Sequence, residues 1–127
     1  MTYHYLASPY THTDPEVMER RYGAALHALH FLLSRKLWTY SPIVHCHELA
    51  KTYALPRTHD FWQTYNHAML DSSKGLLILV IEGWNESRGI EDEIHTARKL
   101  LLPVGFLHPN PHDDSNHPAN EYTVRSA

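Results

Sequence analysis

The chain has 127 residues, which suffice for one domain with a hydrophobic core and are too few for two. Its net charge of −3, with histidine neutral, provides no strong field for nucleic acid or an acidic membrane, and no apolar run is long enough to span a bilayer. The single cysteine, Cys46, cannot form an internal disulfide, and the first residues lack the pattern of a signal peptide. These features predict a cytoplasmic protein.

Strand-like and helix-like segments alternate along the chain. A short apolar strand is expected at residues 3–7, and Asp14 followed by Pro15 predicts the N-cap and first position of a long helix. The later elements are expected in this order: a strand at 37–40, a short helix at 45–51, a helix capped by Asp60, a strand at 76–81, a helix from Ser87 and a strand at 103–107. This alternation predicts a parallel sheet of four to five strands with helices on both faces.

We expect one domain over residues 1–107, followed by a C-terminal tail over residues 108–127. The tail is rich in Pro, Asn, Asp and His and has no periodicity. We expect such a segment to be ordered only if it docks on a partner.

The strand at 76–81 and the helix after it single out one carboxylate. The run Leu76–Ile81 is apolar throughout, as in a strand buried on both faces. Four residues of the next helix form one apolar stripe: Ile90, Ile94, Ala97 and Leu101. Glu93 lies within that stripe and is expected to face inward at the sheet edge where ligands bind in open α/β folds. A buried carboxylate is costly unless it is paired or used, and the alternative is a structural Glu bonded to backbone or to a Tyr.

Two segments can hold an anion near Glu93. The loop Ser8–Thr13 offers hydroxyl and N–H groups close to a helix start, although an ordinary loop would look the same. Ser87 begins the Glu93 helix, where the dipole favours negative charge. It can equally be a plain N-cap, and a serine can do both.

Aromatic and imidazole side chains suggest further contacts. Tyr5 and Tyr10 can reach the same sheet edge as Glu93, where a Tyr hydroxyl would tune its basicity, although strand tyrosines often only fill the core. His45 and His47 resemble metal ligands, because alternate positions of an extended segment place both rings on one side. Two ligands are too few for zinc, so we favour a pocket wall or a loop surface and expect no metal.

The ordered set of motifs resembles the nucleoside 2-deoxyribosyltransferase-like superfamily. The features that carry the resemblance are Tyr5-Leu-Ala-Ser-Pro-Tyr10 and Ser87-Arg-Gly-Ile-Glu-Asp-Glu93. With Ser41–His47 and Gly83–Gly89, the chain is similar to a small, mostly phage and bacterial branch of unknown function, related to 2′-deoxynucleoside 5′-monophosphate N-hydrolases. The resemblance covers residues 3–107 and implies a flavodoxin-like (Rossmann-like) three-layer sandwich.

The resemblance also implies a chemistry. Glu93 would attack the anomeric carbon of a deoxyribose and expel the base, and water or a second base would open the glycosyl-enzyme ester. No cofactor or metal takes part. Tyr5 matches the tyrosine that hydrogen-bonds this glutamate.

The same resemblance assigns the substrate contacts. Transferases acting on free nucleosides carry Asp at position 87, whereas the monophosphate hydrolases carry Ser, so Ser87 favours a 5′-phosphate, with Ser8 as a second phosphate contact. The remaining candidates for substrate contact are Tyr10, Gly89, His45, His47, Trp62 and Trp84. An Asp that helps the base to leave is often found where this chain has Asn66; Asp71 is close in sequence but in another register. Asn116 or Asn120 of a neighbouring subunit could complete the site of a homodimer.

The leading hypothesis is an N-glycosidase that hydrolyses (deoxy)nucleoside 5′-monophosphates. The alternatives are a 2-deoxyribosyltransferase that exchanges bases, a nucleotide-binding module that has lost catalysis, and a zinc protein built on His45 and His47. The expected partner is a small nucleotide or nucleoside, with no nucleic acid polymer and no membrane.

Overall fold

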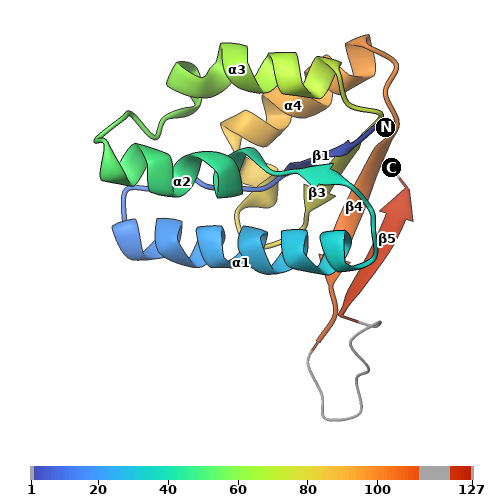
Figure 1. The fold of residues 1–127 in the computed structure, drawn as a ribbon, viewed down its shortest axis with the longest axis horizontal. Helices are drawn as coiled ribbons and strands as arrows, with labels where there is room; N and C mark the ends of the chain where they lie inside the picture. Colours follow the sequence, from blue (N-terminus) through green and yellow to red (C-terminus); the bar gives the residue numbers. More distant parts are fainter. Residues whose placement is uncertain (1, 112–120, 127) are drawn as a thin grey trace.

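The computed structural model describes residues 2–111 and 121–126, which form a mixed α/β fold around one five-stranded sheet (Figure 1). The strand order is β2-β1-β3-β4-β5; the first four strands are parallel, and β5 runs antiparallel to β4. The strands are β1 (His4–Ala7), β2 (Thr39–Tyr40), β3 (Leu76–Leu79), β4 (Val104–Pro109) and β5 (Tyr122–Ser126). The mostly parallel sheet agrees with the alternating pattern of the sequence.

The helices begin only partly where the sequence predicts. They are α1 (Pro15–Ser34), α2 (Pro42–Thr52), α3 (His59–Asp71), the short 3-10 helix η1 (Trp84–Glu86) and α4 (Arg88–Lys99). Asp14 caps α1 by accepting from the N–H of Glu16, and Pro15 occupies the first turn, as predicted. The expected cap of α3 is wrong: Asp60 lies inside its first turn, and the capping position is Thr58.

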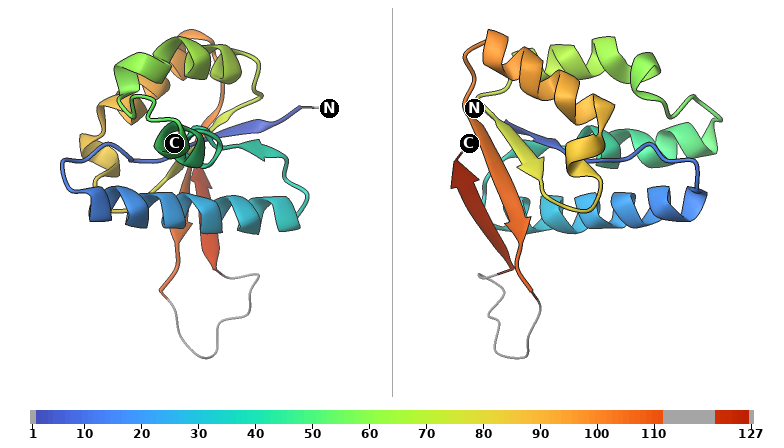
Figure 2. Two further views of the ribbon diagram at one scale, coloured as in Figure 1. Left: turned by 60° about the vertical axis from the view of Figure 1, so that its left-hand side comes forward. Right: turned by 180° about the vertical axis from the view of Figure 1, so that it is seen from behind.

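The sheet lies between two helical layers (Figure 2). Alternate residues of β1 and β3 face opposite sides, as strand geometry requires. On one side Tyr5, Ala7, Leu76 and Ile78 pack with Leu70 of α3 and with Ile90 and Ala97 of α4. On the other side Leu6, Leu77 and Leu79 pack with Ala28, Phe31 and Leu32 of α1. The result is a three-layer α/β sandwich.

Several boundaries differ from the predicted ones: α2 begins at Pro42 instead of residue 45, and β2 begins at Thr39 instead of residue 37. The central strand ends at Leu79 rather than Ile81. Leu101, expected on the buried stripe of α4, is 89% exposed because the helix ends at Lys99 and Leu101 adopts a positive φ of 58°. The inward stripe is therefore Ile90, Glu93 and Ala97.

The C-terminal prediction is wrong for Tyr122–Ser126, which form β5 instead of an unstructured tail. This strand pairs with β4 from Gly105 to Pro109, and Tyr122 packs on Phe31 of α1 with ring centroids 4.6 Å apart. The run Tyr-Thr-Val-Arg-Ser is too short to stand out against the polar composition around it. Within the described ranges, no helix is long and apolar enough to cross a membrane.

Candidate active site

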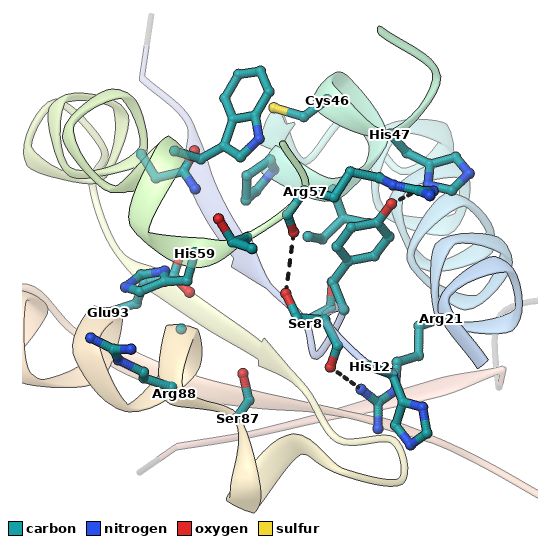
Figure 3. Close-up of a pocket in the computed structure, with 18 of the residues that line it drawn as sticks. Ser8, His12, Arg21, Cys46, His47, Arg57, His59, Ser87, Arg88 and Glu93 are labelled. Atoms are coloured by element: carbon teal, nitrogen blue, oxygen red, sulfur yellow. Dashed lines mark hydrogen bonds between the residues drawn. The ribbon is translucent and has the colours of Figure 1, made fainter. Parts of the chain in front are cut away.

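A pocket of about 510 Å³ opens at the carboxyl ends of β1 and β3 (Figure 3). Its walls come from the loop after β1, from α2, and from the first turns of α3 and α4. Eight residues expected at the site from sequence line it: Ser8, Tyr10, His47, Trp62, Asn66, Ser87, Gly89 and Glu93. The volume lies within the range of small-molecule sites.

Glu93 faces inward, as its place in the apolar stripe of α4 predicts. Only 6% of the residue is exposed, and its Oε2 atom has no hydrogen-bond partner among the described residues. Burial raises the pKa of Glu93 to about 8; the nearby Tyr5 hydroxyl opposes this shift and the charge of Asp92 adds to it. The site therefore holds a carboxyl group that is largely protonated near neutral pH.

Tyr5 lies beneath Glu93 on β1 and is fully buried. Burial, and then the charge of Glu93, raise the pKa of the Tyr5 hydroxyl, which consequently keeps its proton. Although this hydroxyl is close enough to affect Glu93, it completes no hydrogen bond of regular geometry within the described part of the chain. Tyr5 is thus placed as a donor towards the carboxyl group.

Five buried polar atoms without a hydrogen-bond partner among the described residues gather at this one place: Tyr5 Oη, Ser8 Oγ, His59 Nε2, Asn66 Oδ1 and Glu93 Oε2. Four of these residues line the pocket, and Tyr5 lies next to one of them, Glu93. Buried polar atoms in folded proteins nearly always have partners. The concentration marks a place where a polar ligand can bind.

Ser87 is the N-cap of α4. Its Oγ atom accepts from the N–H of Ile90 at 3.2 Å, which leaves the hydroxyl proton available for another acceptor. Gly89 follows in the first turn, and a Cβ atom added there would lie 3.3 Å from His59 Nδ1. The small residue therefore lets the start of α4 approach α3 closely.

Three arginines line the pocket: Arg21, Arg57 and Arg88. The Arg21 Nη1 atom donates to the carbonyl of Thr11 at 3.1 Å, and Arg88 forms an exposed ion pair with Asp60 at 3.3 Å. Sequence reasoning noticed Arg88 but missed Arg21 and Arg57, which come from segments with no motif of their own. The arginines make the mouth of the pocket suitable for an anionic group.

His47 and His45 do not share a side. Helix α2 turns about 200° over two residues, so the expected extended geometry is wrong. His47 is buried, with Nδ1 2.5 Å from Tyr10 Oη and Nε2 3.1 Å from Glu19 Oε1, whereas His45 is exposed and meets Tyr65 Oη at 3.0 Å. No group of three metal-ligating side chains occurs in residues 2–111 and 121–126.

The structure leaves several expected residues outside the pocket. Trp84 packs edge-on against Phe106, with ring centroids 5.5 Å apart, on another part of the surface. Asp71 is exposed at the far end of α3. Asn116 and Asn120 lie outside the described residues. Trp62, in contrast, lines the pocket and donates from Nε1 to the carbonyl of Pro56 at 2.8 Å.

The sequence of residues 2–108 matches a family described as a domain of unknown function (DUF1937). The chain belongs to this family. The DUF1937 match runs from before β1 into β4, so it includes every residue that lines the pocket, whereas β5 lies beyond it. No curated protein matches the chain.

Proposed function

We propose that the chain is an N-glycosidase that hydrolyses the base–sugar bond of (deoxy)nucleoside 5′-monophosphates, with Glu93 as the nucleophile. The observation that carries the proposal is the buried Glu93 carboxyl, with an unpaired oxygen, in a pocket that also contains the N-cap Ser87 of the same helix. One helix would thus present a nucleophile to the sugar and an anion site to the phosphate.

The strand order supports placing the protein within the flavodoxin-like folds, as the resemblance to the nucleoside 2-deoxyribosyltransferase-like superfamily implies. The order β2-β1-β3-β4-β5 is the flavodoxin-like order, although β5 is antiparallel here. In such sheets ligands bind beyond the carboxyl ends of the strands, which is where the pocket opens.

In the proposed reaction a Glu93 oxygen bonds to the anomeric carbon as the bond to the base breaks. The transition state has oxocarbenium character, which a buried carboxylate stabilises by charge and by covalent capture. Water then opens the ester and releases the sugar phosphate. The Tyr5 hydroxyl, which lies close to Glu93, would donate to the carboxylate and fix its orientation.

The phosphate is assigned to the start of α4 and the loop after β1. Ser87 and Ser8 both have hydroxyl groups at the pocket, and neither would repel a phosphate as an aspartate would. The free N–H groups of the first helical turn and the helix dipole favour an anion there. The pocket arginines Arg21 and Arg57 add positive charge.

Asn66 favours a second candidate function, a nucleotide-binding module without turnover. It lines the pocket where the resemblance expects an aspartate, and an amide cannot donate a proton as an acid.

We further propose a homodimer in the cytoplasm as the working form, in which a neighbouring subunit contributes to the site.

The test is release of free base from a panel of ribo- and deoxynucleosides and their 5′-monophosphates, measured from pH 6 to pH 9, a range that includes the pKa of about 8 of Glu93. We expect release from monophosphates in preference to nucleosides, and a loss of about 10³-fold or more in Glu93→Gln. Ser87→Asp should lower the ratio of activity on monophosphates to activity on nucleosides by about tenfold or more, because a carboxylate would then face the phosphate.

The matched control is Glu91→Gln, an exposed carboxylate on the first turn of the same helix, which should retain full activity. Full activity in Glu93→Gln would exclude the proposed nucleophile. Trapping of the sugar by a second free base, in preference to water, would instead identify a base-exchanging transferase. Tight binding of a monophosphate with no turnover would identify the binding module.

A further inference from the structure

Cleavage of the base–sugar bond leaves an electron pair on a ring nitrogen of the base. A positioned acid that protonates this nitrogen typically contributes a factor of about 10² to 10⁴. Asn66 cannot supply the proton, and its buried Oδ1 atom can only accept a hydrogen bond. The pocket must hold the acid elsewhere.

His59 is a titratable side chain on the same side of the pocket as Glu93 (Figure 3). It is the first residue of α3, and its side chain is 16% exposed. The Nδ1 atom is the ring atom nearest the backbone of Gly89, another lining residue. One edge of the imidazole ring therefore lies against the pocket wall that carries Glu93.

The second ring nitrogen of His59, Nε2, faces Asp92 of α4. His59 Nε2 lies 3.3 Å from Asp92 Oδ2 without a hydrogen bond of regular geometry, and His67 Nε2 lies 2.5 Å from the same oxygen. Burial alone would raise the pKa of Asp92, but the hydrogen bond from His67 and the charges of both histidines lower it overall. An anionic Asp92 therefore lies beside the ring of His59, where it can restrict the orientation of the ring.

We propose that His59, held by Asp92, is the acid that protonates the departing base. The inference rests on the proposed N-glycosidase function and names its second catalytic residue; Asp92 is a positioning residue.

As Glu93 bonds to the anomeric carbon, the electron pair of the breaking bond goes to the base nitrogen, which takes the proton of the His59 imidazolium. Neutral His59 then takes a proton from the water that opens the ester. That step restores the imidazolium and the Glu93 carboxylate, and it releases the sugar phosphate.

Leaving-group dependence tests this role. Two substrates are compared: a deoxynucleoside 5′-monophosphate and 4-nitrophenyl 2-deoxyribofuranoside 5-phosphate, whose nitrophenolate leaves without protonation. In His59→Gln we expect kcat for the nucleotide to fall by about 10²-fold or more, while kcat for the nitrophenyl substrate changes less than about fivefold. Asp92→Asn should show the same selectivity with a smaller loss.

His95→Gln is the matched control, because His95 is an exposed histidine of α4 that does not line the pocket. This variant should change kcat for both substrates equally and by only a small factor. Melting temperatures of all variants, and the second variant His59→Asn, separate a folding defect from a catalytic one.

Equal losses on both substrates in His59→Gln and His59→Asn would overturn the acid role while leaving the N-glycosidase intact, provided that Glu93→Gln is inactive on both. Absence of turnover of either substrate by the unaltered protein, or full activity of Glu93→Gln, would overturn the proposed function and this inference with it.

Discussion

Glu93 combines two properties that oppose each other at neutral pH. Attack on a sugar requires the carboxylate, whereas burial raises its pKa to about 8 and favours the acid. The negative charge of the substrate phosphate does not favour ionisation of Glu93. The positive charge that develops on the sugar, in contrast, favours the carboxylate in the transition state. The burial that makes ionisation costly in the resting protein also strengthens this attraction.

The raised pKa of Glu93 predicts how stability changes with pH. The folded protein keeps the Glu93 proton until about pH 8, whereas the unfolded chain releases it near its ordinary value of 4.5. The stabilisation is therefore complete below pH 4.5 and is lost as pH rises towards 8, by at most about 1.4 kcal/mol per pH unit. Urea unfolding between pH 5 and 8 should show this decline, and Glu93→Gln should lack it.

Glu91→Gln is again the control, since this exposed residue should leave the decline unchanged. Parallel pH profiles for the unaltered protein and Glu93→Gln would show that Glu93 titrates normally in the folded state.

The inward position of Glu93 was predictable because the spacing of Ile90 and Ala97 fixes which face of α4 is buried. The positions of His59 and Arg21 were not. Each belongs to a different helix, and only the packing of those helices brings them to one pocket. No local pattern carries that information. The error at His45 and His47 has a local cause, since the segment is helical rather than extended.

At the scale of elements, Arg21 of α1 connects the two loops that flank the pocket. Its Nη1 atom bonds the carbonyl of Thr11 in the loop after β1, and its Nη2 atom lies against Gly83 in the loop after β3. Gly83 has a φ of 93°, in the region that favours glycine. The guanidinium group of Arg21 therefore contacts both loops.

Gly83→Ala should destabilise the protein and weaken substrate binding. The new Cβ atom would lie 2.3 Å from Arg21 Nη2, and the positive φ would cost about 1 kcal/mol or more in addition. We expect a lower melting temperature and a raised KM, because Arg21 must leave the carbonyl of Thr11.

The chain offers an opposite control in Gly23, an exposed residue of α1 with no atom within 4 Å of an added Cβ. Gly23→Ala should stabilise the protein by about 0.5–1 kcal/mol through helix propensity. If Gly83→Ala melted as high as the unaltered protein, the close packing of Arg21 on this loop would be excluded.

Two helix starts were predictable because their signals are local, whereas α2 begins at Pro42 instead of residue 45 and Asp60 does not cap α3. Asp14 and Ser87 both act as N-caps at the expected places, through bonds to Glu16 and Ile90. Strand ends were less predictable, since pairing with a distant neighbour decides them. The central strand stops at Leu79 although the apolar run continues to Ile81.

At the scale of the whole molecule, the alternation of strands and helices predicted a parallel sheet with helices on both faces. It could not predict that the last strand returns antiparallel along β4. That pairing joins Leu107 to Val124 and depends on contacts across the sheet rather than on any pattern within Tyr122–Ser126. Even so, the carboxyl edge of the central strands was located correctly as the place of the pocket.

The position of β5 determines where the chain can be cut. The family match stops at residue 108, and a chain shortened to that point would lack the strand that covers β4. The exposed N–H and C=O groups of β4 would then form an open sheet edge, which favours association between copies. The loss of Tyr122 from its contact with Phe31 would remove about 2 kcal/mol of apolar burial. Size-exclusion chromatography should therefore show aggregates for the shortened chain. A monodisperse species with an unchanged melting temperature would contradict this expectation. We thus expect the stable folding unit to include β5, which lies beyond the residues that match the family.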